Sequence, residues 1–206
     1  MVIDRIEANE FVDWIRKLHL EPIRVIVGIC GPPGSGKSTL TSQLASELDA
    51  AVVPMDGFHL PNTVLDRRGL RALKGAPHTF DAAAFVEAIR RLRRAEAPVS
   101  LPSFERVVDE PIPDAISVAP TDPIVLVEGN YLLLDQSPWS ELSDLLDAVA
   151  YVELDDAVRV ERLVARHVEF GRSPKEAREF VLASDERNAV LVAASRQRAD
   201  VVVSIA

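Results

Sequence analysis

The chain contains 206 residues, enough for one domain or for a domain with a small lid, and 48% of them are hydrophobic, as in ordinary globular proteins. No apolar run approaches the roughly 18 residues of a membrane span, the first residues lack the basic leader of a signal peptide, and the single cysteine, Cys30, excludes an internal disulfide framework. The 32 acidic and 23 basic residues give a net charge of −9, which argues against a general nucleic-acid or membrane-surface binder.

Hydrophobic patterning along the chain predicts alternating strands and helices. Short β-branched runs predict five strands, at Ile23–Cys30, Ala51–Met55, Ile124–Glu128, Val149–Leu154 and Asp200–Ile205. Helical spacing and capping residues predict helices at Asp4–Leu18, at Lys37–Leu48, from an Asp81 cap through Arg94, and over 155–170 and 173–194, with Gly171 between the last two. This alternation is typical of an α/β fold with a five-stranded, mainly parallel sheet and helices on both faces.

One long segment has no predicted strand or helix. It runs from Pro98 to Pro123, and a loop of this length in a compact domain is more often functional than idle. No internal repeat, low-complexity tract or Gly/Ser linker interrupts the chain. We therefore expect residues 1–206 to form a single domain.

The segment Gly31-Pro32-Pro33-Gly34-Ser35-Gly36-Lys37-Ser38 fits the pattern G-x-x-x-x-G-K-[ST] between an apolar strand and a helix. Glycines allow the backbone N–H groups to turn toward phosphate oxygens, and the helix N-terminus adds donors and the positive end of its dipole. We expect Lys37 to reach the β- and γ-phosphates and the Ser38 hydroxyl to hold Mg²⁺, with Thr39 in the same site. The segment predicts nucleoside triphosphate binding and a P-loop NTPase fold, a three-layer sandwich.

Two carboxylates follow the predicted strands on which the site would be built. Asp56 comes after the second strand and Glu128 ends the third. Because the carboxyl ends of parallel strands meet at one edge of a sheet, both side chains are expected to face the γ-phosphate. One would orient and deprotonate an acceptor hydroxyl, and the other would hold Mg²⁺ directly or through water. The alternative for each is a simple turn residue.

Four further segments resemble the phosphoribulokinase/uridine kinase family of P-loop kinases, which includes the bacterial pantothenate kinases. They are Met55–Leu60, Pro77–Asp81, Val127–Leu134 and Ser195–Asp200, and with the phosphate loop they span most of the chain from Ile23 to Ile205. The resemblance implies an ATP-dependent kinase that transfers the γ-phosphoryl group to a hydroxyl of a small metabolite. It also implies that Asp56 is the general base and that Glu128 serves the metal or the substrate.

The resemblance further implies a short lid within about residues 155–175. Arg159, Arg162 and Arg166 are spaced by three and four residues, which places them on one face of a helix. Lid arginines of such kinases neutralise charge on the transferred phosphoryl group, and Arg162 and Arg166 are the preferred pair. Arg172 is the third candidate for nucleotide binding. The alternative is a solvated helix face that pairs with nearby glutamates.

The acceptor residues are less well defined by the resemblance. His59 and Arg106 are candidate substrate contacts, but the segment Pro98–Arg106 departs from the tyrosine-bearing Pro-x-Tyr-Asp segment of uridine kinases. Four basic residues, Arg67, Arg68, Arg71 and Lys74, would suit an acceptor with its own anionic group. The alternative for these four is an exposed basic loop.

The segment Lys74–Asp81 resembles a bacterial subgroup whose members are called fructokinases or nucleoside/nucleotide kinase-like proteins. A sugar such as fructose is therefore the first expected substrate, and a nucleoside or a pantothenate-type acceptor is the alternative. A hypothesis of another class is a nucleotide switch or an ATPase that works without an acceptor. We expect ATP, Mg²⁺ and a small-molecule acceptor as the ligands, a cytoplasmic location, and a homodimer as the default state of a soluble enzyme.

Overall fold

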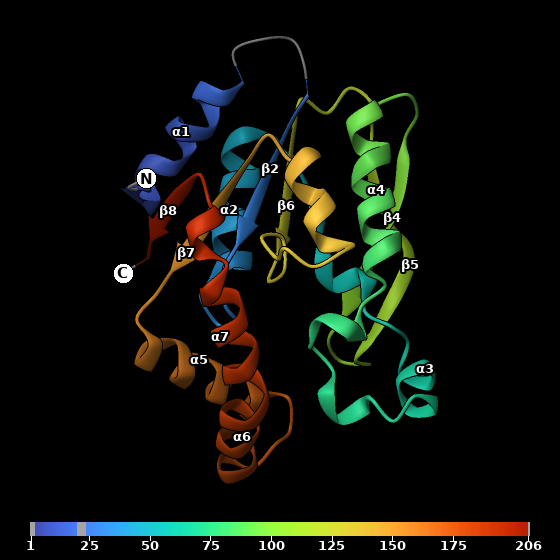
Figure 1. Cartoon of the computed structure of the whole chain (residues 1–206), viewed down its shortest axis with the longest axis vertical. Coiled ribbons are helices and arrows are strands. Elements are labelled where there is room, and N and C mark those ends of the chain that lie inside the picture. The colour runs from blue at the N-terminus through green and yellow to red at the C-terminus, as the bar shows by residue number, and fades with distance from the viewer. Residues whose placement is uncertain (1–2, 20–23, 206) are drawn as a thin grey trace.

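A six-stranded parallel sheet forms the centre of the computed structural model, which describes residues 3–19 and 24–205 (Figure 1). The strand order is β1-β8-β7-β2-β6-β3. The strands are β1 Asp4–Glu7, β2 Val25–Cys30, β3 Ala51–Pro54, β6 Ile124–Gly129, β7 Ala148–Glu153 and β8 Val201–Ser204. The predicted α/β fold with a mainly parallel sheet is confirmed, and all five predicted strands are present; Ile23, the predicted start of the first, lies outside the described residues.

Helices cover both faces of this sheet. One core cluster joins α1 Phe11–Leu18 and α2 Lys37–Leu48 to one face, and the other joins α4 Ala82–Arg94 and α7 Glu186–Ala194 to the opposite face. Strand β2 is buried on both sides, with Ile26 and Cys30 in the cluster of α4. The predicted α2 is confirmed, and Asp81 caps α4 by accepting a hydrogen bond of 3.0 Å from the Ala84 backbone N–H.

The N-terminal prediction of one helix over Asp4–Leu18 was wrong in its first half. Residues Asp4–Glu7 form β1, which pairs in parallel with β8 and adds a sixth strand to the predicted five. A short 3-10 turn then leads into α1. Strand β1 is an edge strand whose side chains are mostly exposed, so its sequence carries no alternation of apolar and polar residues.

The segment Pro98–Pro123, predicted to be irregular, contains an antiparallel hairpin. Its strands are β4 Val99–Glu105 and β5 Glu110–Val118, which form a separate two-stranded sheet beside α4 (Figure 1). Three prolines within the hairpin argued against strands. Proline is tolerated in this position because each strand has an edge that makes no ladder hydrogen bonds.

The C-terminal third contains the helices predicted over 155–170 and 173–194. Helix α5 spans Asp156–Glu169, and Gly171 follows it with φ of +98°. The second predicted helix is divided, because α6 Pro174–Phe180 and α7 are joined by a π-helical turn at Val181–Asp185. A short helix, α3 Asn62–Arg67, and a 3-10 turn at Met55–Phe58 lie between β3 and α4.

Gly57 allows the hairpin to lie against the 3-10 turn that carries Asp56. A Cβ atom at Gly57 would lie 2.3 Å from the backbone oxygen of Pro102 in β4. We predict that Gly57→Ala lowers the free energy of unfolding by about 1–3 kcal/mol, because backbone atoms must move apart. Urea unfolding would measure the change, and a Gly57→Ala variant as stable as the natural protein would show that this contact tolerates a methyl group.

Candidate active site

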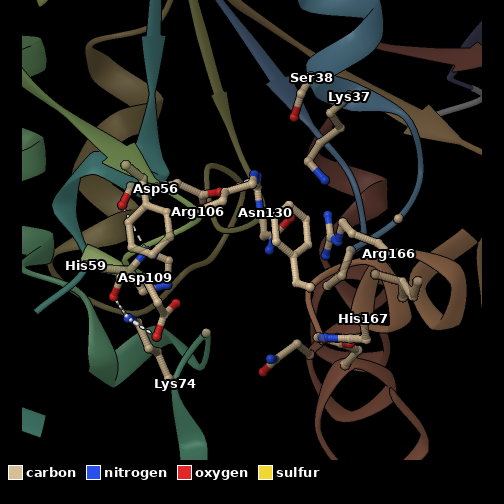
Figure 2. Close-up of a pocket in the computed structure, with 18 of the residues that line it drawn as sticks. Lys37, Ser38, Asp56, His59, Lys74, Arg106, Asp109, Asn130, Arg166 and His167 are labelled. Atoms are coloured by element: carbon tan, nitrogen blue, oxygen red, sulfur yellow. Dashed lines mark hydrogen bonds and ion pairs between the residues drawn. The ribbon is translucent and has the colours of Figure 1, made fainter. Parts of the chain in front are cut away.

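A cavity of about 680 Å³ lies beyond the carboxyl ends of β2, β3 and β6. Figure 2 shows Lys37 and Ser38 on one side of it, Asp56, His59, Lys74 and Asp109 on a second, and Arg166 and His167 on a third. These side chains come from the phosphate loop, the segment after β3, the hairpin and the lid region. The fold therefore brings together groups that are more than a hundred residues apart in the chain.

The phosphate loop has the geometry that its sequence predicts. Gly34 and Gly36 have φ of +80° and +87°, a region that favours glycine, and α2 begins at Lys37. Lys37 is buried, and its Nζ donates a hydrogen bond of 2.9 Å to the Pro32 carbonyl. Burial lowers the pKa of Lys37, and the charge of Glu128 opposes this effect. A nearby phosphate would add the anion that this ammonium group needs.

The part of the loop that faces the cavity fits a phosphate. Gly34, Gly36 and Lys37 line the cavity, and α2 begins at Lys37. A helix N-terminus with such a lysine is a common binding site for phosphate oxygens. Ser35 Oγ, which finds no hydrogen-bond partner among the described residues, is buried and does not line the cavity.

Ser38 and Glu128 form the pair of oxygen ligands expected for Mg²⁺. The Ser38 hydroxyl donates a hydrogen bond of 3.1 Å to Glu128 Oε2. Burial raises the pKa of Glu128, Lys37 opposes this shift, and Asp56 adds to it. Among the described residues no group of three or more His, Cys, Asp or Glu side chains could hold a metal.

Asp56 lies in the 3-10 turn after β3, and Arg106 at the tip of the hairpin contacts it. Arg106 Nη2 lies 3.2 Å from Asp56 Oδ2. His59 Nδ1 lies 2.8 Å from the Asp56 carbonyl oxygen, to which it can donate a hydrogen bond. The centre of the His59 ring lies 3.9 Å from the centre of the Phe80 ring. Burial lowers the pKa of His59, so its neutral form is favoured. All three predicted acceptor-side residues line the cavity.

The arginines of the predicted lid divide into two groups. Arg162 and Arg166 line the cavity, as does Arg172. Burial lowers the pKa of Arg166, and Arg106 adds to this effect. Arg172 stacks over the ring of Phe180 at 3.7 Å, and its Nη1 lies 3.1 Å from His167 Nδ1.

Arg159 was expected to share the face of Arg162 and Arg166, but it has a different position. Its side chain is 1% exposed, and it contacts Asp156 at 3.0 Å and Glu186 at 2.7 Å. Its Nη1 also donates a hydrogen bond of 3.3 Å to the Pro33 carbonyl of the phosphate loop. Arg159 therefore ties α5 and α7 to the loop, whereas Arg162 and Arg166 face the cavity.

Several other residues that line the cavity were not among the predicted site residues. They are Asp109, Asn130, His167, Asp185 and Asn188. His167 Nε2 lies 3.0 Å from Asp185 Oδ2, a contact that depends on the π-helical turn ending at Asp185. A strand-end position gave a signal for Asn130, whereas the others depend on contacts between distant segments.

Comparisons with known proteins agree with this geometry. A model of the Phosphoribulokinase / Uridine kinase family matches residues 26–206. The uncharacterised protein YggC of Escherichia coli is 38% identical over 189 residues, which cover 88% of this chain and 78% of that protein. A Schizosaccharomyces pombe protein, provisionally classed as a uridine kinase, is 37% identical over 87% of this chain and 83% of its own length.

A solved structure is similar over almost the whole chain. It is that of a Silicibacter protein provisionally classed as a fructose transport system kinase, with a TM-score of 0.88 and 36% identity. The match covers 96% of this chain and 98% of that chain.

The described residues contain no helix long and apolar enough to cross a membrane.

The two groups of lid arginines lead to a prediction about stability. Arg159→Leu removes three contacts from a buried guanidinium and leaves Glu186 without its partner, so we expect a loss of roughly 2–4 kcal/mol in the free energy of unfolding. Arg162→Leu, the matched control on the same helix, should lower activity with a far smaller loss of stability. Thermal unfolding of both variants tests this, and equal losses would contradict the division.

Proposed function

The chain belongs to the phosphoribulokinase/uridine kinase family and is an ATP-dependent kinase, and from this premise we propose that its acceptor is a small neutral polyhydroxy compound. A sugar such as fructose is the first candidate. One observation carries this proposal: the Asp56 carboxylate lies at the wall of the cavity between the phosphate loop and the hairpin.

Asp56 is suited to act on an acceptor hydroxyl. It is close enough to the phosphate loop for its charge to affect the pKa values of Lys37 and Glu128. Arg106 holds one oxygen of Asp56, so the other can accept a hydrogen bond from the acceptor. Asp56 would then orient the hydroxyl for in-line attack and accept its proton, while the bond from the hydroxyl oxygen to the γ-phosphorus forms and the bond to the departing ADP breaks.

The cations around the cavity would stabilise the transferred group. Lys37 would contact the β- and γ-phosphates, and Arg162 and Arg166 would approach the equatorial oxygens of the phosphoryl group from α5. Ser38 and Glu128 would hold Mg²⁺, which supplies charge neutralisation at the phosphate oxygens when bound. No covalent intermediate on the protein is needed.

The acceptor half of the cavity favours a neutral ligand. Of the four basic residues of the segment 67–74, only Arg71 and Lys74 line the cavity, and both contact Asp109. Their charge is therefore largely balanced within the protein. The amides of Asn130 and Asn188 and the imidazole of His59 add groups that hydrogen-bond to hydroxyls.

Other acceptors and another reaction are alternatives. A nucleoside would use the aromatic rings of Phe80 and Phe104 in the cavity wall. A pantothenate-type acceptor would need a cation for its carboxylate, and Arg106 is the nearest candidate to Asp56. An ATPase without an acceptor would need a group that orients a water molecule in place of the acceptor hydroxyl.

We predict that one neutral polyol among a panel of sugars, nucleosides, pantothenate and their monophosphates stimulates ATP turnover many-fold. An assay that couples ADP formation to NADH oxidation, with Mg²⁺ present, measures this directly. Stimulation only by a phosphorylated or carboxylated compound would contradict the neutral acceptor. Steady hydrolysis that no compound stimulates would favour the ATPase.

The role of Asp56 leads to a second prediction. Asp56→Asn should lower kcat by about 10²–10⁴, because the amide cannot accept the proton, while the ATP dissociation constant changes little. Asp66→Asn, which removes an exposed acid from the neighbouring helix α3, is the matched control. Turnover of Asp56→Asn close to that of the control would exclude Asp56 as the base.

A further inference from the structure

Lys74 has no role in the chemistry proposed above, yet it is the most completely paired cation in the acceptor half of the cavity. Its side chain is 11% exposed, and its Nζ lies 2.8 Å from Asp109 Oδ2. The same Nζ donates hydrogen bonds of 2.7 Å to Asn62 Oδ1 and 2.6 Å to the Asp109 carbonyl. The ammonium group is therefore held within the protein by two hydrogen bonds and one ion pair.

The partners of Lys74 belong to the hairpin tip and to the start of α3. Asp109 is the last residue of the turn between β4 and β5, with φ of +53°. Asn62 Nδ2 donates a hydrogen bond of 2.8 Å to the Asp109 carbonyl, and the Asn62 backbone N–H lies 3.1 Å from each carboxylate oxygen of Glu110. Lys74, Asn62 and Asp109 thus contact one another at the hairpin tip. We call this group of three residues the clamp.

The same hairpin tip carries Arg106, three residues before Asp109. Arg106 contacts Asp56, and Phe104 on β4 lies beneath Lys74 with its ring centre 5.0 Å from Nζ. The middle of β4 lies against the turn of Asp56, where Pro102 closely approaches Gly57. This contact and the clamp at the tip together determine where Arg106 and Phe104 enter the cavity.

We propose that Lys74 is a positioning residue for the acceptor site: through the clamp it holds the hairpin so that Arg106 meets Asp56. This inference rests on the proposed function, because it assigns Arg106 to the acceptor half of the cavity. It differs from the expectation that Lys74 binds an anionic group of the acceptor. In the clamp the positive charge of Lys74 faces Asp109. The contacts with the acceptor would then come from Arg106 and Phe104 of the hairpin.

The kinetic test uses Lys74→Met, Arg106→Met and the double variant, with Arg68→Met as the matched control. Arg68 is an exposed cation of the same segment that does not line the cavity. Lys74→Met should raise the KM for the acceptor about 10–100-fold, since a displacement of about 1 Å at a site can cost that much. The KM for ATP should stay within about twofold, and Arg68→Met should behave as the natural protein.

The double variant separates positioning from direct binding. If Lys74 acts through Arg106, adding Lys74→Met to Arg106→Met should change the acceptor KM by less than about twofold. Losses that multiply would overturn the proposal, because Lys74 would then contact the acceptor itself. An acceptor KM of Lys74→Met equal to that of the control would also overturn it.

Hydrogen exchange provides a readout that does not depend on the acceptor. Backbone amides of residues 105–110 should exchange faster in Lys74→Met than in Arg68→Met, whereas those of β2 and β6 should be unchanged. Asp109→Asn, which keeps the backbone carbonyl contact, should show a smaller change in the same amides. If no compound stimulates the natural protein, the proposed function fails, and unchanged exchange at the hairpin tip separately refutes the clamp.

Discussion

The parallel pairing of β6 with both β2 and β3 is the constraint on which the site depends. In this register Glu128 lies beside Ile29 on β2 and beside Pro54 on β3. Two residues beyond these partners the chain reaches Gly31, the start of the phosphate loop, and Asp56. A slip by one residue in either pair would turn Glu128 toward the other face of the sheet and separate it from Ser38.

Three charged side chains of the cavity are disfavoured by their burial, and each is affected by the charges of its neighbours. Burial disfavours the charged forms of Lys37, Arg166 and Glu128. It therefore lowers the pKa of the two cations and raises the pKa of the carboxyl group. A triphosphate near Lys37 and Arg166 would raise their pKa values again, and a divalent cation near Glu128 would lower that of the carboxyl group. Under the proposed function, a metal–nucleotide complex would therefore supply the opposite charges that these three groups lack.

Residue patterns in the sequence were sufficient to predict those elements that are determined by residues close together in the chain. The phosphate loop, the cap at Asp81 and the strand before Glu128 could all be predicted, because each depends on residues that are close in the chain. Strand β1 could not, since an exposed edge strand depends on its pairing with β8. The roles of Arg159 and Lys74 were also hidden, because their partners lie in segments that only the folded chain brings together.

Arg159, which is buried, and Lys74, which is largely buried, are cations whose partners belong to the protein, and we propose that both position the site. Arg159 fixes the first turns of α5 to the Pro33 carbonyl, so Arg162 and Arg166, one and two turns further along, have a defined position relative to the phosphate loop. Under our proposal, the contacts of Lys74 with Asp109 would do the same for the hairpin on the other side of the cavity. Because each is satisfied by protein partners, neither has to be moved by a ligand. The cations that line the cavity and remain for a ligand are Arg162 and Arg166 on α5, and Arg106 at the hairpin tip, where it is paired with Asp56.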